Sequence, residues 1–320
     1  MKKVILLIGP TGVGKTSVSI LIAKTLHSEI ISADSMQVYR HMDIGTAKPS
    51  VDEQRQIKHH LIDVVEPWES FSTGQYITAV VPLIDRLLED GKTPLVTGGT
   101  GLYIKAMTRG IFSGPSADWK LRNEFIDKER DDPGYLYKSL KSLDPGAASR
   151  IMPGDTRRII RAMEVCLKSS STMTAQHQMH TKPLPYEFVK IGLTRDRKEL
   201  YRLIDERVDQ MMERGLLKEA GSVIELIKSE GHRQLPIAGS TSPLVYSSMQ
   251  AIGYKEMAMH LNGEISLVEA TALIKQRSRN YAKRQFTWFR KEAGIKWIDM
   301  TGIFDTEEMC GNVLQIISAC

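Results

Sequence analysis

Short apolar runs alternate with amphipathic stretches along the first third of the chain. Residues 16–27 and Thr73–Glu89 place apolar side chains at helical spacing. The runs between these helices have the length of buried parallel strands and cover residues 4–8, 29–32 and 94–97. Strands and helices that alternate in this order predict an α/β fold built on a doubly wound parallel sheet.

From about residue 113 the pattern changes to short amphipathic helices, which are separated by Pro-Gly turns such as those at 133–134 and 145–146. No further strand pattern occurs until residues 188–193, which return the chain to the sheet. The sequence therefore predicts a sheet-based core and a helical insertion. The core is residues 1–112 and 189–320, and the insertion is residues 113–188.

Two polar motifs open helices in the second half of the chain. Asp196 and Glu199 predict a capping box, and so do Ser266 and Glu269. The residues between these two helices include 231–248, which are rich in Pro, Gly and Ser and predict a loop. The first of the helices has one apolar side, formed by Leu200, Ile204, Val208 and Met211.

Composition is that of an ordinary soluble protein. The 320 residues are 42% hydrophobic and 25% charged, and no apolar run is long enough to span a membrane. The net charge of +5 permits a nucleic-acid partner without requiring one. Cys166, Cys310 and Cys320 form no C-x-x-C motif, which argues against a disulfide framework or a cysteine zinc site. We therefore expect a cytoplasmic protein without a membrane segment.

The most informative motif follows the first predicted strand. It is a complete G-x-x-x-x-G-K-[ST] phosphate-binding loop, formed by Gly9, Pro10, Thr11, Gly12, Val13, Gly14, Lys15 and Thr16. The glycines let the backbone wrap round an anion, and the amides at the start of the next helix point at it. Lys15 is expected to reach the outer phosphate, and the Thr16 hydroxyl to hold Mg²⁺. The motif predicts a bound di- or triphosphate group but not the molecule that carries it.

Two further segments end predicted strands, and ligands of open α/β sheets sit at that edge. Asp34 fits a general base or an Mg²⁺ partner there, although Asp is also a preferred helix N-cap. Residues 97–103 contain three glycines, which allow backbone to approach a ligand closely or form a tight turn. Because the preceding strand ends in Thr97 and not in an acid, the chain does not look like an ATP-driven motor. His59 and His60 have no third metal ligand nearby, so we expect structural hydrogen bonds from them.

The predicted C-terminal helix is strongly basic. Ile274, Tyr281 and Trp288 fall on one apolar stripe of it. Few acids interrupt the basic residues beside this stripe, which are Lys275, Arg277, Arg279, Lys283, Arg284, Arg290 and Lys291. A second basic cluster lies in the insertion and consists of Arg157, Arg158 and Arg161. The two clusters fit a clamp around a polyanion, and they equally fit ordinary solvated helix faces.

Taken in order, these motifs resemble the bacterial tRNA dimethylallyltransferases, also called tRNA isopentenyltransferases. The resemblance runs almost from end to end of the chain. Besides the phosphate-binding loop, it includes residues 34–39, 42–49, 59–63, 98–103, 157–165, 251–256 and 282–290.

The resemblance implies a reaction between dimethylallyl diphosphate and tRNA. The dimethylallyl group passes to the exocyclic amine, N6, of the adenosine immediately 3′ of the anticodon, and pyrophosphate leaves. The tRNAs concerned read codons that begin with U. The resemblance further implies a P-loop catalytic core, residues 1–112 and 189–320, whose C-terminal helices bind tRNA. Residues 113–188 would form a mobile arm that closes on the anticodon stem-loop.

The resemblance also assigns roles to residues that match the family motifs. Asp34 is the implied general base, Arg207 and Lys15 face the pyrophosphate, and Thr16 holds Mg²⁺, the implied cofactor. Diphosphate is bound by residues 9–16. The implied tRNA contacts are Asp34, Ser35, Met36, Gln37, Thr100, Arg122, Arg157, Arg158, Ile159, Ile160, Arg161, Arg277, Arg279, Lys283 and Arg284. We expect such an enzyme to work as a monomer.

Two other classes of protein stay open at this point. A P-loop kinase of small molecules would bind ATP and have no need of the basic helix. A non-catalytic tRNA-binding protein, whose loop merely holds a nucleotide, would bind RNA without turnover. Transfer of label from dimethylallyl diphosphate into tRNA separates these classes from a prenyltransferase.

Overall fold

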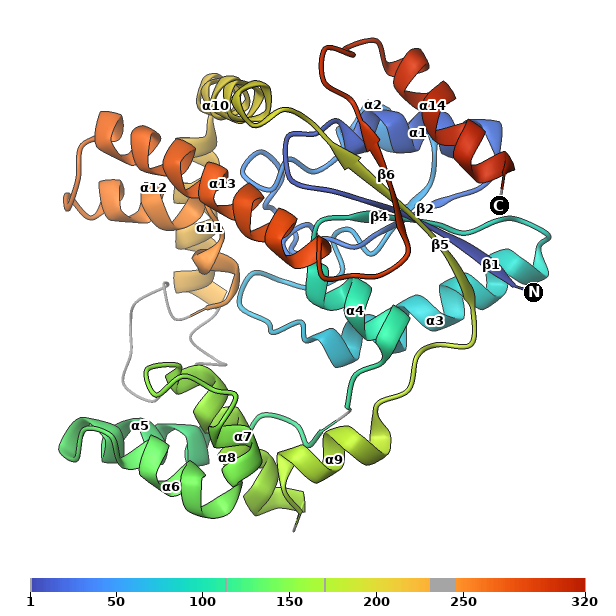
Figure 1. Ribbon diagram of the computed structural model, residues 1–320. Helices are drawn as coiled ribbons and strands as arrows, with labels where there is room; N and C mark the ends of the chain where they lie inside the picture. Colours follow the sequence, from blue (N-terminus) through green and yellow to red (C-terminus); the bar gives the residue numbers. More distant parts are fainter. Residues whose placement is uncertain (1, 113, 170, 231–245, 320) are drawn as a thin grey trace. The chain divides into compact units, whose positions relative to one another are not determined.

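The computed structural model describes residues 2–112, 114–169, 171–230 and 246–319 (Figure 1). The loop predicted over 231–248 lies outside the described residues, except for its last three positions. The chain divides into two compact units. The core unit is formed by the described parts of 1–105, 185–234 and 241–320, and the helical unit by the described parts of 106–184.

The core unit is built on one sheet in which every strand pair is parallel. The strand order is β3-β2-β4-β1-β5-β6, which confirms the predicted α/β fold class. The strands are β1 (Lys3–Ile8), β2 (Ile30–Ser32), β3 (His59–His60), β4 (Leu95–Gly98), β5 (Glu187–Thr194) and β6 (Ile295–Asp299). Neither β3 nor β6 was predicted, because β3 has only two residues and no side chain of β6 is fully buried.

Helices cover both faces of this sheet (Figure 1). On one face lie α1 (Lys15–Thr25) and α14 (Thr306–Ser318), and on the other lie α3 (Thr73–Glu89) and α4 (Gly101–Arg109). The remaining helices of the core unit are α2 (Val51–Gln56), α10 (Arg197–Glu213), α11 (Leu216–Glu230), η3 (Ser248–Gln250), α12 (Tyr254–Leu261) and α13 (Leu267–Phe289). Among the described residues, no helix combines the length and the apolar character needed to cross a membrane.

The predicted starts of α10 and α13 are found, but only one of them is a capping box. At α10 the Asp196 side chain accepts a hydrogen bond from the Glu199 amide, as expected of a cap. The predicted box is wrong there, because the Glu199 carboxylate pairs with Arg195 and does not reach back to the cap. At α13 the reciprocal hydrogen bonds between Ser266 and Glu269 confirm the box.

The helical unit has a hydrophobic core of its own. Within it, Glu164 is fully buried and accepts hydrogen bonds from Arg122 Nη2 at 2.7 Å and Arg161 Nη1 at 2.6 Å. The unit starts inside α4, before the expected boundary at 113, and it ends before β5 begins. Its other helices are α5 (Trp119–Asp131), α6 (Tyr135–Leu143), α7 (Pro145–Ala148), α8 (Thr156–Ser169) and α9 (Met173–His180).

Glu29, directly before β2, joins three elements through its carboxylate. It accepts hydrogen bonds from His60 on β3, Arg86 on α3 and Lys92 after α3, at 2.6, 2.8 and 2.9 Å. The His60 contact, like the hydrogen bond from His59 to the Ile57 carbonyl, confirms a structural role for the paired histidines. Burial alone would raise the pKa of Glu29, but the hydrogen bonds from Lys92 and His60 outweigh it and lower the pKa to about 2.

Replacement of Glu29 with Gln should therefore remove a stabilisation that depends on pH. A carboxylate with a lowered pKa stabilises the fold above its unfolded pKa, near 4.5, and this stabilisation is lost as pH falls toward 2. The wild-type advantage in free energy of unfolding should be full near neutral pH and shrink below 4.5. Urea unfolding of both proteins across this range measures it, with E89Q at an exposed position as the control. An advantage that does not change with pH would contradict the prediction.

Candidate active site

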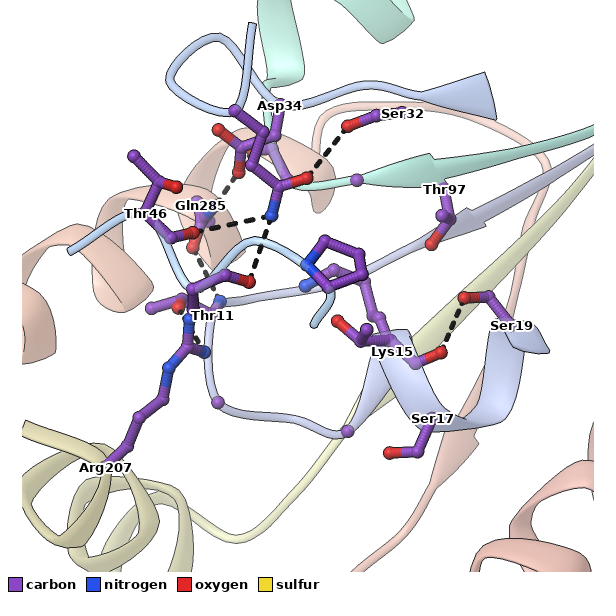
Figure 2. A pocket seen from close by; sticks show the side chains of 18 of the residues that line it. Thr11, Lys15, Ser17, Ser19, Ser32, Asp34, Thr46, Thr97, Arg207 and Gln285 are labelled. Atoms are coloured by element: carbon purple, nitrogen blue, oxygen red, sulfur yellow. Dashed lines mark hydrogen bonds between the residues drawn. The ribbon is translucent and has the colours of Figure 1, made fainter. Parts of the chain in front are cut away.

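The carboxyl ends of β1, β2 and β4 meet at a cavity of about 360 Å³ in the core unit (Figure 2). The phosphate-binding loop follows β1, Asp34 follows β2, and the glycine-rich turn follows β4. All three segments line the cavity. They are far apart in the sequence, but the parallel strands before them end at the same edge of the sheet, as predicted.

The phosphate-binding loop leaves the start of α1 open to an anion. Gly14 precedes the helix with a φ of 104°, a left-handed conformation that other residues rarely adopt. No side chain caps the helix. The first amides of α1 therefore have no capping acceptor, and together with the helix dipole they favour a bound anion.

The Lys15 ammonium folds back on this loop. Its Nζ donates to the carbonyl oxygens of Gly9, at 2.9 Å, and Pro10, at 2.7 Å. Burial and the nearby Arg207 guanidinium lower the pKa of Lys15 to about 7, against the opposing effect of the Asp34 carboxylate. An anion bound beside Lys15 would restore its charged form.

Arg207 points from α10 into the same cavity (Figure 2). Its Nη1 donates to the Thr11 hydroxyl at 3.3 Å, and burial lowers its pKa while Asp34 opposes that shift. Within the described residues, no carboxylate lies within ion-pair distance of Arg207. The acids beside it on α10 pair with other cations: Asp205 with Arg279, Glu206 with Arg202, and Asp209 with Lys275. Arg207 is therefore no surface ion-pair partner, and it is placed to meet a ligand.

Asp34 lines the same cavity as the two cations. Its Oδ1 accepts a hydrogen bond from the Met36 amide at 2.8 Å. The following residues form a turn and no helix, so the interpretation of Asp34 as a helix N-cap is wrong. The Asp34 carboxylate acts on the pKa of both Lys15 and Arg207, as expected of a charge close to each.

A second cavity, of about 280 Å³, shares part of its wall with the first. The shared residues are Thr11, Asp34, Thr46, Arg207 and Tyr281. The second cavity adds apolar side chains, which include Met36, Val208, Met211, Ile252 and Ile274. An anion-binding surface and an apolar surface thus adjoin at Asp34 and Arg207, which suits a ligand with one charged and one apolar end.

Gln285 on α13 joins two of the loops, a role that was not predicted from the sequence. Its Oε1 accepts from the Thr11 amide at 2.9 Å, and its Nε2 donates to the Gly99 carbonyl, also at 2.9 Å. The side chain is buried. A Cβ at Gly99 would lie only 2.2 Å from Gln285 Nε2, so a side chain at this position would displace the Gln285 amide. The sequence did contain a signal for this role. Gln285 is a polar residue on the same buried side of the helix as Ala282 and Phe289, and buried polar side chains usually have hydrogen-bond partners.

Residues 34–37, which follow β2 after Ala33, also belong to the site. Ser35 and Met36 line the second cavity, and the Ser35 amide donates to the Thr100 hydroxyl at 2.9 Å. Gln37 lines the first cavity, and its Nε2 donates to the Ala47 carbonyl at 3.2 Å. The structure thus brings Asp34, Ser35, Met36, Gln37 and Thr100 together, while their predicted contacts with tRNA stay predictions.

The basic helix α13 differs from its expected form. Ile274 is buried as predicted, but Tyr281 and Trp288 are only half-buried, and Tyr281 lines both cavities. Few acids lie within α13 itself, but acids from other helices pair with three of its basic residues. These pairs are Lys275 with Asp209, Arg277 with Glu256, and Arg279 with Asp205. Lys283 and Arg284 are exposed, and the Arg284 guanidinium lies 5.7 Å from the centre of the Tyr281 ring.

In the helical unit, the structure divides the second basic cluster. Ile159 and Ile160 are 1% and 6% exposed and belong to the hydrophobic core, so the implied contact of their side chains with tRNA does not fit. Arg122 and Arg161 are held by the buried Glu164. Two residues of the cluster, Arg157 and Arg158, are exposed on α8.

The oxygen atoms at the site suit a magnesium ion held mainly by a ligand. The described residues contain no group of three or more His, Cys, Asp or Glu side chains arranged for a metal. Thr16 and Asp34 line the first cavity and supply a hydroxyl and a carboxylate. Mg²⁺ is commonly bound by one or two protein oxygens together with phosphate oxygens and water, so these residues fit the implied ion.

Comparison with known proteins gives a consistent result. Residues 37–292 match the IPP transferase family. A tRNA dimethylallyltransferase of Thermodesulfovibrio yellowstonii is 53% identical over 317 residues, which cover 99% of this chain and 98% of that protein.

Two solved structures are similar over the whole of this chain. The tRNA isopentenylpyrophosphate transferase of Bacillus halodurans has a TM-score of 0.70 at 40% identity, and 96% of it is covered. A eukaryotic dimethylallyltransferase captured acting on tRNA has a TM-score of 0.80 at 28% identity, and 80% of it is covered.

The pKa of Lys15 predicts how anion binding depends on pH. In the protein without a bound anion, Lys15 has a pKa of about 7, and a bound anion raises this pKa. The affinity for inorganic pyrophosphate should therefore fall as pH rises above 7. The fall should approach about tenfold per pH unit. In K15R the guanidinium stays charged, so any pH dependence of its pyrophosphate affinity comes from titration of the pyrophosphate. The additional pH dependence of the wild type is then due to Lys15. Calorimetry at several pH values measures both affinities, and identical pH dependences would contradict the prediction.

Proposed function

The chain belongs to the IPP transferase family, and we propose that it is a tRNA dimethylallyltransferase. It transfers the dimethylallyl group of dimethylallyl diphosphate to N6 of the adenosine 3′ of the anticodon, in tRNAs that read codons beginning with U. Pyrophosphate is released. The observation that carries this proposal within the molecule is the junction of the two cavities, where Asp34 and Arg207 border an anion-binding loop on one side and an apolar pocket on the other.

The phosphate-binding loop serves the leaving group. The open amides of α1, Lys15 and Arg207 would all face the diphosphate and stabilise the charge that develops on it as its bond to carbon breaks. The Thr16 hydroxyl would hold Mg²⁺ together with phosphate oxygens and water. The ion would supply further positive charge against the phosphate oxygens.

Asp34 serves the nucleophile. The exocyclic amine of adenine is weakly nucleophilic because its lone pair is delocalised into the ring. As the bond between N6 and the prenyl carbon forms, the bond between that carbon and the diphosphate oxygen breaks, and N6 loses a proton to Asp34. The Met36 amide holds Oδ1 of this carboxylate, which orients it and leaves Oδ2 for the amine.

The adenosine must leave the stack of the anticodon loop before it can reach Asp34. Extruding a base from a single-stranded loop costs on the order of a few kcal/mol. The second cavity, with the Tyr281 ring and several apolar side chains, provides a surface on which an extruded base can stack. The exposed Lys283 and Arg284 on α13 would meet the RNA backbone.

Incorporation of label tests the proposal directly. The protein is incubated with radiolabelled dimethylallyl diphosphate, Mg²⁺ and unmodified tRNA, and the nucleosides are then analysed by mass spectrometry. The expected product is N6-dimethylallyladenosine at one position. Binding of tRNA without transfer would identify a tRNA-binding protein, and phosphorylation that requires ATP would identify a kinase.

Asp34→Asn should reduce turnover by about 10²–10⁴-fold, the usual contribution of a general base. The side chain keeps its shape and can still accept from the Met36 amide, so the fold and most of the tRNA affinity should persist. Single-turnover experiments measure the rate of transfer, filter binding measures the tRNA affinity, and a thermal melt checks the fold. Turnover close to that of the wild type would remove Asp34 from the role of base.

Lys283→Ala should weaken tRNA binding through the loss of a phosphate contact. The plot of log affinity against log salt should flatten by roughly 0.7 to 0.9, and further in the double variant with Arg284→Ala. Affinity for dimethylallyl diphosphate should barely change. Lys275→Ala is the matched control, because it removes the same charge from the same helix but Asp209 already engages that ammonium at 2.6 Å. An equal salt slope for K283A and the wild type would show that Lys283 is only solvated.

A further inference from the structure

One carboxylate on α11 holds the turn at residues 43–47. Glu219 Oε2 accepts from the amides of Asp43, at 3.0 Å, and Ile44, at 2.9 Å, and its Oε1 accepts from the Gly45 amide at 3.1 Å. The buried Tyr254 hydroxyl donates to Oε1 at 2.5 Å. Three successive backbone amides thus surround one charged side chain, as they would surround a bound anion.

The conformation of this turn depends on such contacts. Ala47 has a φ of 48°, in the left-handed region that residues other than glycine rarely adopt. A Cβ at Gly45 would lie 2.4 Å from the Tyr254 ring, so the backbone passes directly against that ring. The turn is also held by the buried Lys48, which pairs with Asp43. A turn with this geometry needs partners that impose it.

The turn forms the wall where the two cavities meet. Thr46 lines both cavities, together with Asp34 and Arg207. The carbonyl oxygens of Thr46 and Ala47 accept from Gln37 Nε2 at 3.4 and 3.2 Å. A displacement of the turn would therefore move Gln37, which is three residues beyond Asp34, and would change the space in which the two substrates meet.

We propose that Glu219 is a positioning residue for the transfer reaction. It lines neither cavity, and it acts by fixing the turn at 43–47 against the site. This inference rests on the proposed function for its effect on turnover. Its physical content, that Glu219 holds the turn, does not require any reaction.

Glu219→Gln tests the proposal, because an amide of the same shape has one oxygen acceptor where the carboxylate has two. The amides of residues 43–45 should exchange hydrogen faster than in the wild type. The rate of transfer per active site should fall by about 10- to 100-fold, which is the cost of a displacement near 1 Å. Pyrophosphate affinity should change by less than about threefold, because the phosphate-binding loop is untouched.

Two further variants calibrate these measurements. Glu225→Gln changes an exposed acid on the same helix, whose one ion pair among the described residues is with Lys228, and should behave as wild type in every assay. Tyr254→Phe removes one hydrogen bond to Glu219 and leaves those from the amides, so its exchange and transfer rates should lie between wild type and E219Q. If E219Q does not fold, Tyr254→Phe still tests whether weaker contacts to Glu219 change the exchange and transfer rates.

The outcomes separate the possible errors. Unchanged exchange at 43–45 in both variants would show that Glu219 does not hold the turn. Faster exchange with an unchanged transfer rate would show that the turn is not needed for chemistry. A loss of activity that only follows the loss of folded protein in a thermal melt would make Glu219 merely structural. If the wild type transfers nothing, the proposed function fails, and the exchange measurements alone decide whether Glu219 holds the turn.

Discussion

Two cations held away from water determine the character of this site. Burial lowers the pKa of both Lys15 and Arg207, and Asp34 is the charge that opposes both shifts. Confining positive charge in this way costs free energy, which a bound anion offsets. The surroundings are consistent with that constraint. The acids nearest to Arg207 on α10 are engaged by other cations, and the start of α1 has no capping side chain.

The wall round these cations is held by groups that add little charge to the cavity. Gln285 fixes the phosphate-binding loop to the turn after β4 through a neutral amide. Glu219 does carry charge, but it lines neither cavity, and its carboxylate accepts hydrogen bonds from three backbone amides. A charged side chain facing the cavity at either place would compete: an anion with the diphosphate, and a cation for the Asp34 carboxylate. Polar contacts whose hydrogen bonds are satisfied give the wall rigidity without that competition.

The parts of the site that were predictable from the sequence depend on local spacing. The run before Gly9, the glycine spacing and Lys15 specify a strand, a loop and a helix within residues 3–25, and Asp34 follows the next strand. The ion pairs of α13 could not be predicted, because Asp205 and Glu256 lie on other helices and only folding brings them to Arg279 and Arg277. Glu219 was missed for the same reason, since its partners are backbone amides more than a hundred residues away.

Ile159 and Ile160 are a different case, because the information was present. Their helix carries apolar residues at helical spacing, and that pattern alone places both side chains in the core of the helical unit. They were included among the RNA contacts because the whole motif was carried over from the family. A motif marks a segment as important, but the periodicity within it decides which of its side chains can reach a ligand.

The placement of Asp34 beside both cations has a consequence for the charge balance of the proposed reaction. When the carbon–oxygen bond breaks, the pyrophosphate gains one negative charge. When N6 gives its proton to Asp34, the carboxylate loses one. Negative charge therefore moves from Asp34 to the leaving group, and the total charge facing Lys15 and Arg207 stays the same. Since the Asp34 charge already acts on both cations before the reaction, they need not be desolvated or moved during it, which is the condition for efficient electrostatic stabilisation.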